Sequence, residues 1–137
     1  MLTIFSCLVV LMFFHWFADF ALQDDKTALE KSDNIKVLFY HCSTYAFWMG
    51  LGSFIVFFTL YLPNPVITAL LFTGWMLITH FGIDYVTARA NKKLWLNNQR
   101  HWFFVMVGFD QFLHISTIIW FYAMALNGYV PIGKTLF

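Results

Sequence analysis

One pair of ionisable residues recurs along the chain at a constant spacing. The segments HWFADF, from residue 15, and HFGIDY, from residue 80, each place an Asp four residues after a His, and DQFLH, from residue 110, holds the pair in reverse order. Residues four apart share one face of a helix, so each pair can direct an imidazole and a carboxylate at one place. The six residues are His15, Asp19, His80, Asp84, Asp110 and His114.

These side chains are natural ligands for a divalent metal. Imidazole nitrogens and carboxylate oxygens suit zinc, manganese and iron. The pairs lie in apolar stretches, where a charged Asp costs about 2.5–3.5 kcal/mol on insertion scales, so each carboxylate needs a partner. Together with His41, at the start of another apolar stretch, they are enough for one or two metal ions. A metal-free proton relay and purely structural His–Asp pairing are the alternatives.

The composition places these residues in a membrane protein. Hydrophobic residues make up 61% of the 137 residues and charged residues only 11%, whereas a soluble domain is about half apolar and about a quarter charged. A spanning helix needs about 20 mostly apolar residues. We therefore expect an all-α membrane protein, a single transmembrane domain over residues 1–137 whose four helices cover about 2–22, 37–62, 65–88 and 102–127.

Two polar connections, DDKTALEKSDNIK and ARANKKLWLNNQR, follow the first and third expected spans. They hold seven of the eight basic residues, so the positive-inside rule predicts cytoplasmic long loops and both termini outside. The first connection has a capping-box pattern from Thr27 to Glu30, which predicts a short surface helix. Because each half pairs a His-x-x-x-Asp helix with a returning helix, we expect two antiparallel hairpins with a pseudo-two-fold axis.

Other residues have candidate roles beside the metal ligands. His41 and Asp110 are candidates for acid–base catalysis as well as for metal binding. Cys42 follows His41 directly and points about 100° away from it on a helix, so we expect it to be a poor ligand. Candidate substrate contacts are Gln23, Lys26 and Gln111.

The motifs resemble those of a known family. With HWFADFALQ in the first span, HC opening the second, HFGID in the third and DQFLH in the fourth, the chain resembles the small bacterial and phage membrane proteins of domain-of-unknown-function family 3307. The family pattern places a lysine shortly after the first motif, and Lys26 or Lys31 fits it. The resemblance implies a bacterial inner membrane protein and brings no activity with it. The chain is similar, more faintly, to membrane proteins labelled metal-dependent hydrolases.

Several functions fit these observations. A formal net charge of +1 without a basic stripe gives no sign of nucleic-acid binding. We expect a metal-dependent hydrolase in the cytoplasmic leaflet, acting on a phosphorylated lipid or metabolite, because a divalent metal activates water and polarises phosphoryl oxygens. A proton or metal-ion transporter or channel, completed by a homo-oligomer, would use the same residues. A haem-binding bundle and a non-enzymatic membrane interaction protein are further alternatives.

Overall fold

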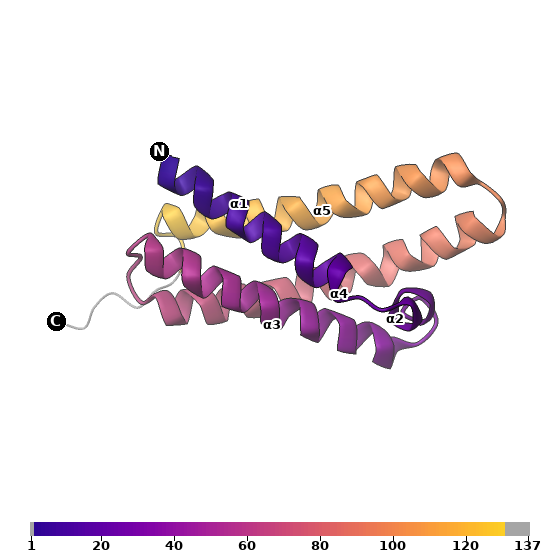
Figure 1. Cartoon of the computed structure of the whole chain (residues 1–137), viewed down its shortest axis with the longest axis horizontal. Helices are drawn as coiled ribbons and strands as arrows, with labels where there is room; N and C mark the ends of the chain where they lie inside the picture. The colour runs from indigo at the N-terminus through magenta and orange to yellow at the C-terminus, as the bar shows by residue number, and fades with distance from the viewer. Residues whose placement is uncertain (1, 131–137) are drawn as a thin grey trace.

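The computed structural model describes residues 2–130, and every regular element in that range is a helix (Figure 1). Four helical segments are long and apolar enough to cross a membrane, which confirms the expected all-α membrane fold. A short helix links the first two of them. The elements are α1 (Leu2–Trp16), the π-helix η1 (Phe17–Ala21) that continues it, α2 (Asp25–Glu30), α3 (Ile35–Thr59), α4 (Pro65–Leu96) and α5 (Arg100–Leu126).

Both polar connections lie at one end of the bundle. Figure 1 shows α2 and the α4–α5 turn at this end, whereas α1 begins, α5 ends and α3 turns into α4 at the other. We call the first of these the α2 end. α4 packs along both α3 and α5, and α1 packs on α3 with a smaller contact to α5. The helices therefore follow one another around the bundle in the order α1, α3, α4, α5.

Side-chain caps start the two helices after η1. Asp24 Oδ1 accepts a hydrogen bond from the Thr27 backbone N–H at 2.7 Å, and Asn34 Oδ1 accepts one from the Lys36 N–H at 3.0 Å. The hydrogen bonds from Thr27 hold the pKa of Asp24 below its usual value. The expected surface helix is therefore present as α2, but its predicted start at Thr27 is wrong, because the extended backbone of Asp24 lets that carboxylate cap the first turn.

α4 is longer than the span expected over residues 65–88. Its 32 residues extend about 48 Å at 1.5 Å per residue, well beyond the roughly 30 Å of bilayer hydrocarbon. The stretch after residue 88 is rich in Ala, Lys, Arg and Leu, all good helix formers, so the helix continues until Asn98 adopts a left-handed backbone with φ 57°. The connection expected there as a polar loop is mostly helix, and α4 continues beyond the expected span to the α2 end (Figure 1).

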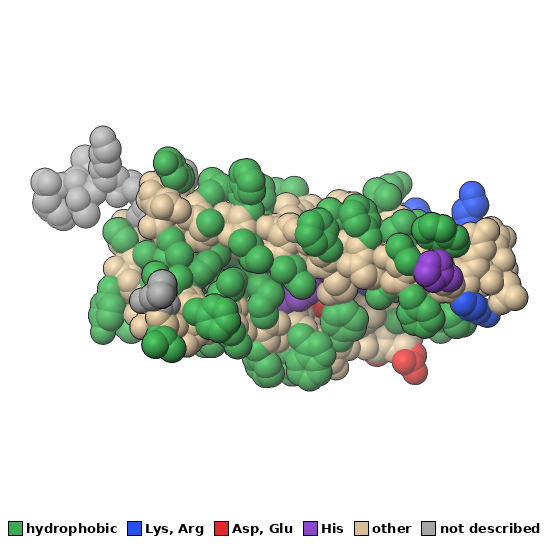
Figure 2. Space-filling model, turned by 90° about the horizontal axis from the view of Figure 1, so that it is seen from above, with side chains coloured by type: hydrophobic (Ala, Val, Ile, Leu, Met, Phe, Trp, Pro, Cys, Tyr) green, Lys and Arg blue, Asp and Glu red, His purple; other side chains and the backbone are tan. Residues whose placement is uncertain are grey.

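An apolar core fills the bundle on the side away from the α2 end. Hydrophobic side chains also cover the outside of the helices, and Lys and Arg gather at the α2 end (Figure 2). Such a surface suits contact with lipid along the helices and with water at their ends. The largest fully buried apolar side chains include Leu11, Met49, Val56, Phe57, Phe72, Met76 and Ile118.

A glycine sets the distance between α1 and α3. A Cβ built on Gly52 would lie 2.6 Å from the ring of Phe14, so only a hydrogen fits at this crossing. Phe14 directly precedes His15, and the close approach therefore brings the first ionisable residue of α1 against α3.

Candidate metal centre

A cluster of metal-ligating side chains forms where η1, α3 and α4 meet. This His41 cluster consists of Asp19, His41 and His80, whose ligand atoms all lie within 4.8 Å of one another. The Nε2 atoms of His41 and His80 are 3.1 Å apart. Asp19 Oδ1 lies 3.2 Å from His41 Nε2 and 3.5 Å from His80 Nε2. All three side chains are buried, so these atoms converge away from bulk water.

A fourth atom, Asp84 Oδ2, completes the arrangement at 3.5 Å from His41 Nε2 and 3.7 Å from His80 Nε2. Ligands of a tetrahedral zinc ion lie about 3.3 Å apart, because zinc bonds to nitrogen and oxygen are about 2.0–2.2 Å long. The five distances that involve the two imidazoles run from 3.1 to 3.7 Å. Since two imidazole nitrogens this close repel unless a proton or a cation lies between them, the geometry fits a bound divalent cation.

A second cluster lies beside the first, between α4 and α5. This His114 cluster consists of Asp84, Asp110 and His114, again with ligand atoms within 4.8 Å of one another. His114 Nε2 is 3.0 Å from Asp84 Oδ1 and 3.5 Å from Asp110 Oδ1. The hydroxyl of Thr87, which belongs to none of the sequence motifs, donates to Asp110 Oδ1 at 2.5 Å and fixes the direction of that carboxylate. Thr87 lies three residues after Asp84, so helical spacing could have found it.

Asp84 is a member of the His114 cluster and also contacts the His41 cluster. Its Oδ2 faces His41 and His80, and its Oδ1 faces His114. In two-metal sites the ions lie about 3.5–4 Å apart, a spacing that one carboxylate can bridge with its two oxygens. The shared Asp84 makes the pair of clusters suitable for two ions as well as for one.

His15 contacts the residues around the clusters instead of joining either one. Its Nε2 donates to Gln111 Oε1 at 2.9 Å, and its Nδ1 accepts from the Tyr45 hydroxyl at 3.0 Å. Gln111 Nε2 in turn donates to Asp19 Oδ2 at 3.2 Å and to Asp110 Oδ2 at 3.0 Å. Because both of its ring nitrogens are engaged, His15 orients the amide that connects the clusters. Its role as a metal ligand stays a prediction.

The π-helix η1 separates two residues that the sequence pattern pairs. In a regular α-helix His15 and Asp19 would share a face, but η1 begins at Phe17 and its wider turn shifts the register between them. Asp19 therefore reaches His41 and His80 while His15 reaches Tyr45 and Gln111. The other two His–Asp pairs, on regular helices, lie within 3.7 Å and 3.5 Å.

The comparisons with known proteins agree with the motifs. The family model described as a protein of unknown function (DUF3307) matches residues 7–132. The chain belongs to the DUF3307 family. The matched range includes every residue of both clusters and confirms the resemblance drawn from the sequence. No curated protein and no solved structure matches the chain, and the DUF3307 description gives no activity, so function must be inferred from the site.

One of the two lysines that fit the DUF3307 pattern reaches the site. Lys31 Nζ lies 2.9 Å from Asp84 Oδ2, whereas Lys26, the predicted substrate contact, is exposed on α2. Burial lowers the pKa of the Lys31 ammonium, but the charges of Asp84 and Asp19 outweigh this and hold the pKa above its ordinary value. Lys31 is therefore positively charged at neutral pH. The motif alone allows either lysine, and only the turn after α2 decides between them.

Three further side chains lie near the clusters. Gln23 Oε1 is buried without a hydrogen-bond partner among residues 2–130, and its role as a substrate contact stays a prediction. Cys42 lies closer than expected, since its Sγ is within 4.8 Å of ligand atoms of His80 and Asp84. α3 packs against both η1 and α4, so neighbouring residues on it can face different parts of the site. The ring of Tyr45 stacks on His80 with centroids 3.7 Å apart and fixes that imidazole.

The charges of the site leave room for a cation. The three carboxylates of the two clusters contribute −3 and Lys31 contributes +1, which leaves −2 when the histidines are neutral. An uncompensated charge of this size is costly away from water. One divalent cation would neutralise it, and a second would require an additional anion, such as a bound phosphate group.

Proposed function

We propose that the protein is a membrane-embedded, metal-dependent hydrolase that acts on a phosphorylated lipid or metabolite. The observation that carries the proposal is Asp84, one buried carboxylate that contacts imidazoles of both clusters. Purely structural pairing needs only one His for each Asp. Here one carboxylate faces three imidazoles and a lysine, which is the ligand density of a metal centre.

The two clusters would hold the metal, which supplies polarisation of a phosphoryl oxygen and activation of water when bound. Asp110 has the most exposed side chain of the three carboxylates, 14% against 5% for Asp19 and 3% for Asp84. In Figure 2 a small area of histidine and acidic colour is visible in a gap between hydrophobic side chains. Asp110, oriented by Thr87 and Gln111, would accept a proton from the attacking water as general base. His41 directs Nε2 into its cluster and would serve as a ligand.

The charge distribution supports a cytoplasmic orientation for the α2 end. Seven of the eight basic residues lie in the two connections at that end. By the positive-inside rule, this bias favours a cytoplasmic α2 end, and in a bacterium the membrane would be the inner one. A hydrolase so oriented would meet substrates in the cytoplasmic leaflet.

A proton or metal-ion transporter is the alternative that uses the same residues. Transport through one copy of the chain needs polar groups on both sides of the clusters. Away from the α2 end, the bundle interior is instead filled by the apolar core, and the buried hydroxyls of Ser53 and Thr68 donate to carbonyls of their own or the adjoining turn. This arrangement favours access from one side, as an enzyme requires, although a homo-oligomer could provide a separate path.

The test is hydrolysis by the purified chain in nanodiscs after loading with zinc, manganese or iron. Phosphatidic acid, phosphatidylglycerol phosphate and soluble nucleotides would be offered, with release of phosphate measured. Asp110→Asn should lower turnover by about 100-fold or more, since it removes the proposed general base and a ligand oxygen of the His114 cluster. Asp25→Asn, an equivalent change at an exposed residue of α2, is the matched control. A metal-loaded chain that hydrolyses none of these substrates but carries protons or metal ions across liposomes would show transport instead.

A further inference from the structure

A partly open cavity of about 550 Å³ lies at the α2 end, lined by α2, the turn after it, the last turns of α4 and the start of α5. We call it the α2 cavity. Lys31 lines it while its Nζ contacts Asp84 Oδ2 at 2.9 Å. A single side chain therefore separates the contents of the cavity from the carboxylate that both metal clusters share.

The polar lining of the cavity suits an anion with hydroxyl or amine groups attached. Lys31 and Lys92 contribute two ammonium groups. Lys92 also forms an ion pair with Asp33, but 41% of the Lys92 side chain and 60% of the Asp33 side chain are exposed. A pair this accessible to water is weak enough for another anion to replace the carboxylate. Asn91 adds a buried side-chain oxygen that has no hydrogen-bond partner among the described residues, and a donor on a ligand could satisfy it.

The remaining lining is apolar and continues onto the surface. Trp95, Leu96 and Phe103 line the cavity on the α4–α5 side, and 48% of Trp95 and 71% of Leu96 are exposed. Exposed Trp and Leu next to lysines are typical of the boundary between lipid and water. The cavity is therefore charged toward the metal clusters and apolar toward the membrane, as an amphipathic ligand requires.

We propose that the α2 cavity binds the phosphate-bearing head group of an anionic membrane phospholipid, whose acyl chains leave over Trp95 and Leu96. The inference rests on the proposed function and names its substrate class, since the lipid phosphate would lie next to Lys31 and hence next to the metal clusters. A soluble phosphorylated metabolite would use the lysines but would leave the apolar side of the cavity unfilled.

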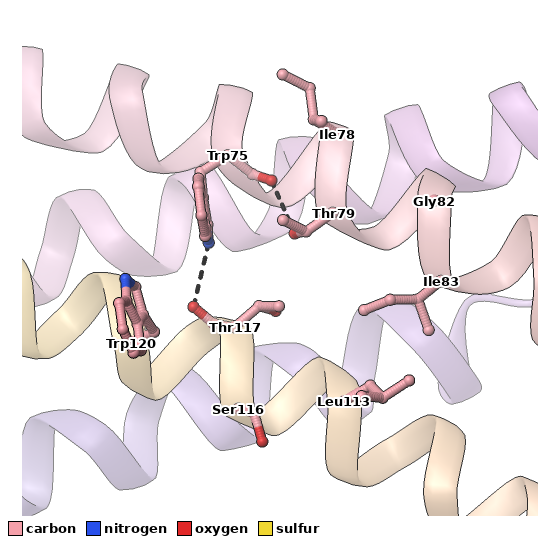
Figure 3. A pocket seen from close by; sticks show the side chains of 9 residues that line it. All are labelled: Trp75, Ile78, Thr79, Gly82, Ile83, Leu113, Ser116, Thr117 and Trp120. Carbon is pink, nitrogen blue, oxygen red and sulfur yellow. Dashed lines mark hydrogen bonds between the residues drawn. The ribbon is translucent and has the colours of Figure 1, made fainter.

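A second cavity lacks the features that a head-group site needs. It lies between α4 and α5 and is lined mostly by apolar side chains such as Trp75, Ile83 and Trp120 (Figure 3). Its hydroxyls are already used, for Thr79 donates to the Trp75 carbonyl and Ser116 to the Phe112 carbonyl. No lysine or arginine lines it, so of these two cavities only the α2 cavity can hold a phosphate.

The test is lipid binding by the full chain in detergent, measured by native mass spectrometry. Dihexanoyl phosphatidic acid, dihexanoyl phosphatidylcholine and glycerol phosphate would be titrated separately, and metal content would be measured on the same samples. Lys92→Gln should weaken phosphatidic acid binding about five-fold, the size of one lysine contact with an anionic lipid. Lys93→Gln, the same change at the adjacent residue that does not line the cavity, should leave binding unchanged. Trp95→Ala should weaken binding of phosphatidic acid but not binding of glycerol phosphate.

Three outcomes overturn the inference. Equal losses in the two lysine variants would show general attraction of anionic lipid to the surface, and equal binding of glycerol phosphate and phosphatidic acid would show a soluble ligand. Binding of phosphatidylcholine as tight as that of phosphatidic acid would exclude recognition of the anionic charge. If the expected pattern appears in a protein that binds metal but hydrolyses nothing, the lipid site holds and the hydrolase proposal fails, so the two results are distinguishable.

Discussion

Replacement of Asp84 by Asn should weaken metal binding at both clusters, whereas the same change at Asp19 or Asp110 should weaken it at one. The expectation follows from the positions of the two Asp84 oxygens. Oδ2 faces the imidazoles of the His41 cluster at 3.5 and 3.7 Å, and Oδ1 faces His114 at 3.0 Å. The other two carboxylates contribute ligand atoms to one of these clusters each.

The size of the effect can be bounded from what the substitution removes. Changing a residue that only supports a metal ligand lowers metal affinity by roughly 10–100-fold. Asp84→Asn removes a ligand oxygen and its negative charge at once, so we expect affinity to fall by about 100-fold or more at each cluster, about 2.7 kcal/mol or more. Asn has nearly the same shape as Asp, so the packing around α4 should be retained.

The assay is competitive titration of zinc into the detergent-purified variants against a chromophoric chelator, with circular dichroism to verify the fold. Asp33→Asn, at an exposed residue outside the clusters, is the control and should bind metal as the parent does. If Asp84→Asn lowered the metal affinity of one cluster and left the other at the wild-type value, the two clusters would not share this carboxylate. Unchanged affinity at both sites would refute its role as a ligand.

Three further predictions concern the surroundings of the site. Lys31→Met should tighten binding of a divalent cation by about ten-fold or more in the same zinc titration. The reason is that an ammonium and a dication a few ångströms apart repel by several kcal/mol even at an effective dielectric constant of about 20. Weaker binding would show that Lys31 supports the metal. Gln111→Leu should lower metal affinity by roughly 10–100-fold without changing the number of ions bound, and a change in that number on elemental analysis would contradict its positioning role. Gly52→Ala should destabilise the bundle by about 1–3 kcal/mol through its clash with Phe14. Gly82→Ala, whose added Cβ meets nothing within 4 Å, should be neutral or stabilising by up to about 1 kcal/mol. Equal unfolding midpoints of the two variants in a denaturant titration would contradict this.

The elements of the fold could be predicted because hydropathy and length determine them directly. Four apolar stretches predicted four long helices, and a polar segment predicted the short helix α2. The extent of α4 could not be predicted, because residues 89–96 are polar enough to suggest a loop while most of them are good helix formers. In such a stretch the end of the helix depends on where the chain can turn, here at Asn98.

The candidate site was predictable in composition but not in arrangement. Spacing four apart correctly indicated that imidazoles and carboxylates meet, since residues on regular helices keep that register. It could not reveal that η1 directs Asp19, but not His15, toward His41 and His80, because a single π-helical turn has no clear sequence pattern. The contact of Lys31 with Asp84 was equally hidden, since it depends on how the connection after α2 folds back over the bundle.

The central claim, that the His41 and His114 clusters hold metal, is tested most directly by elemental analysis. The chain would be purified in detergent without chelator beside a His41→Ala/His80→Ala double variant of verified helical content. We predict one or two equivalents of zinc, manganese or iron in the parent and about one equivalent fewer in the variant, since both imidazoles of the His41 cluster are removed while the His114 cluster is left intact. A folded parent without metal, which also fails to bind any of the three on titration, would contradict it and favour a His–Asp proton relay.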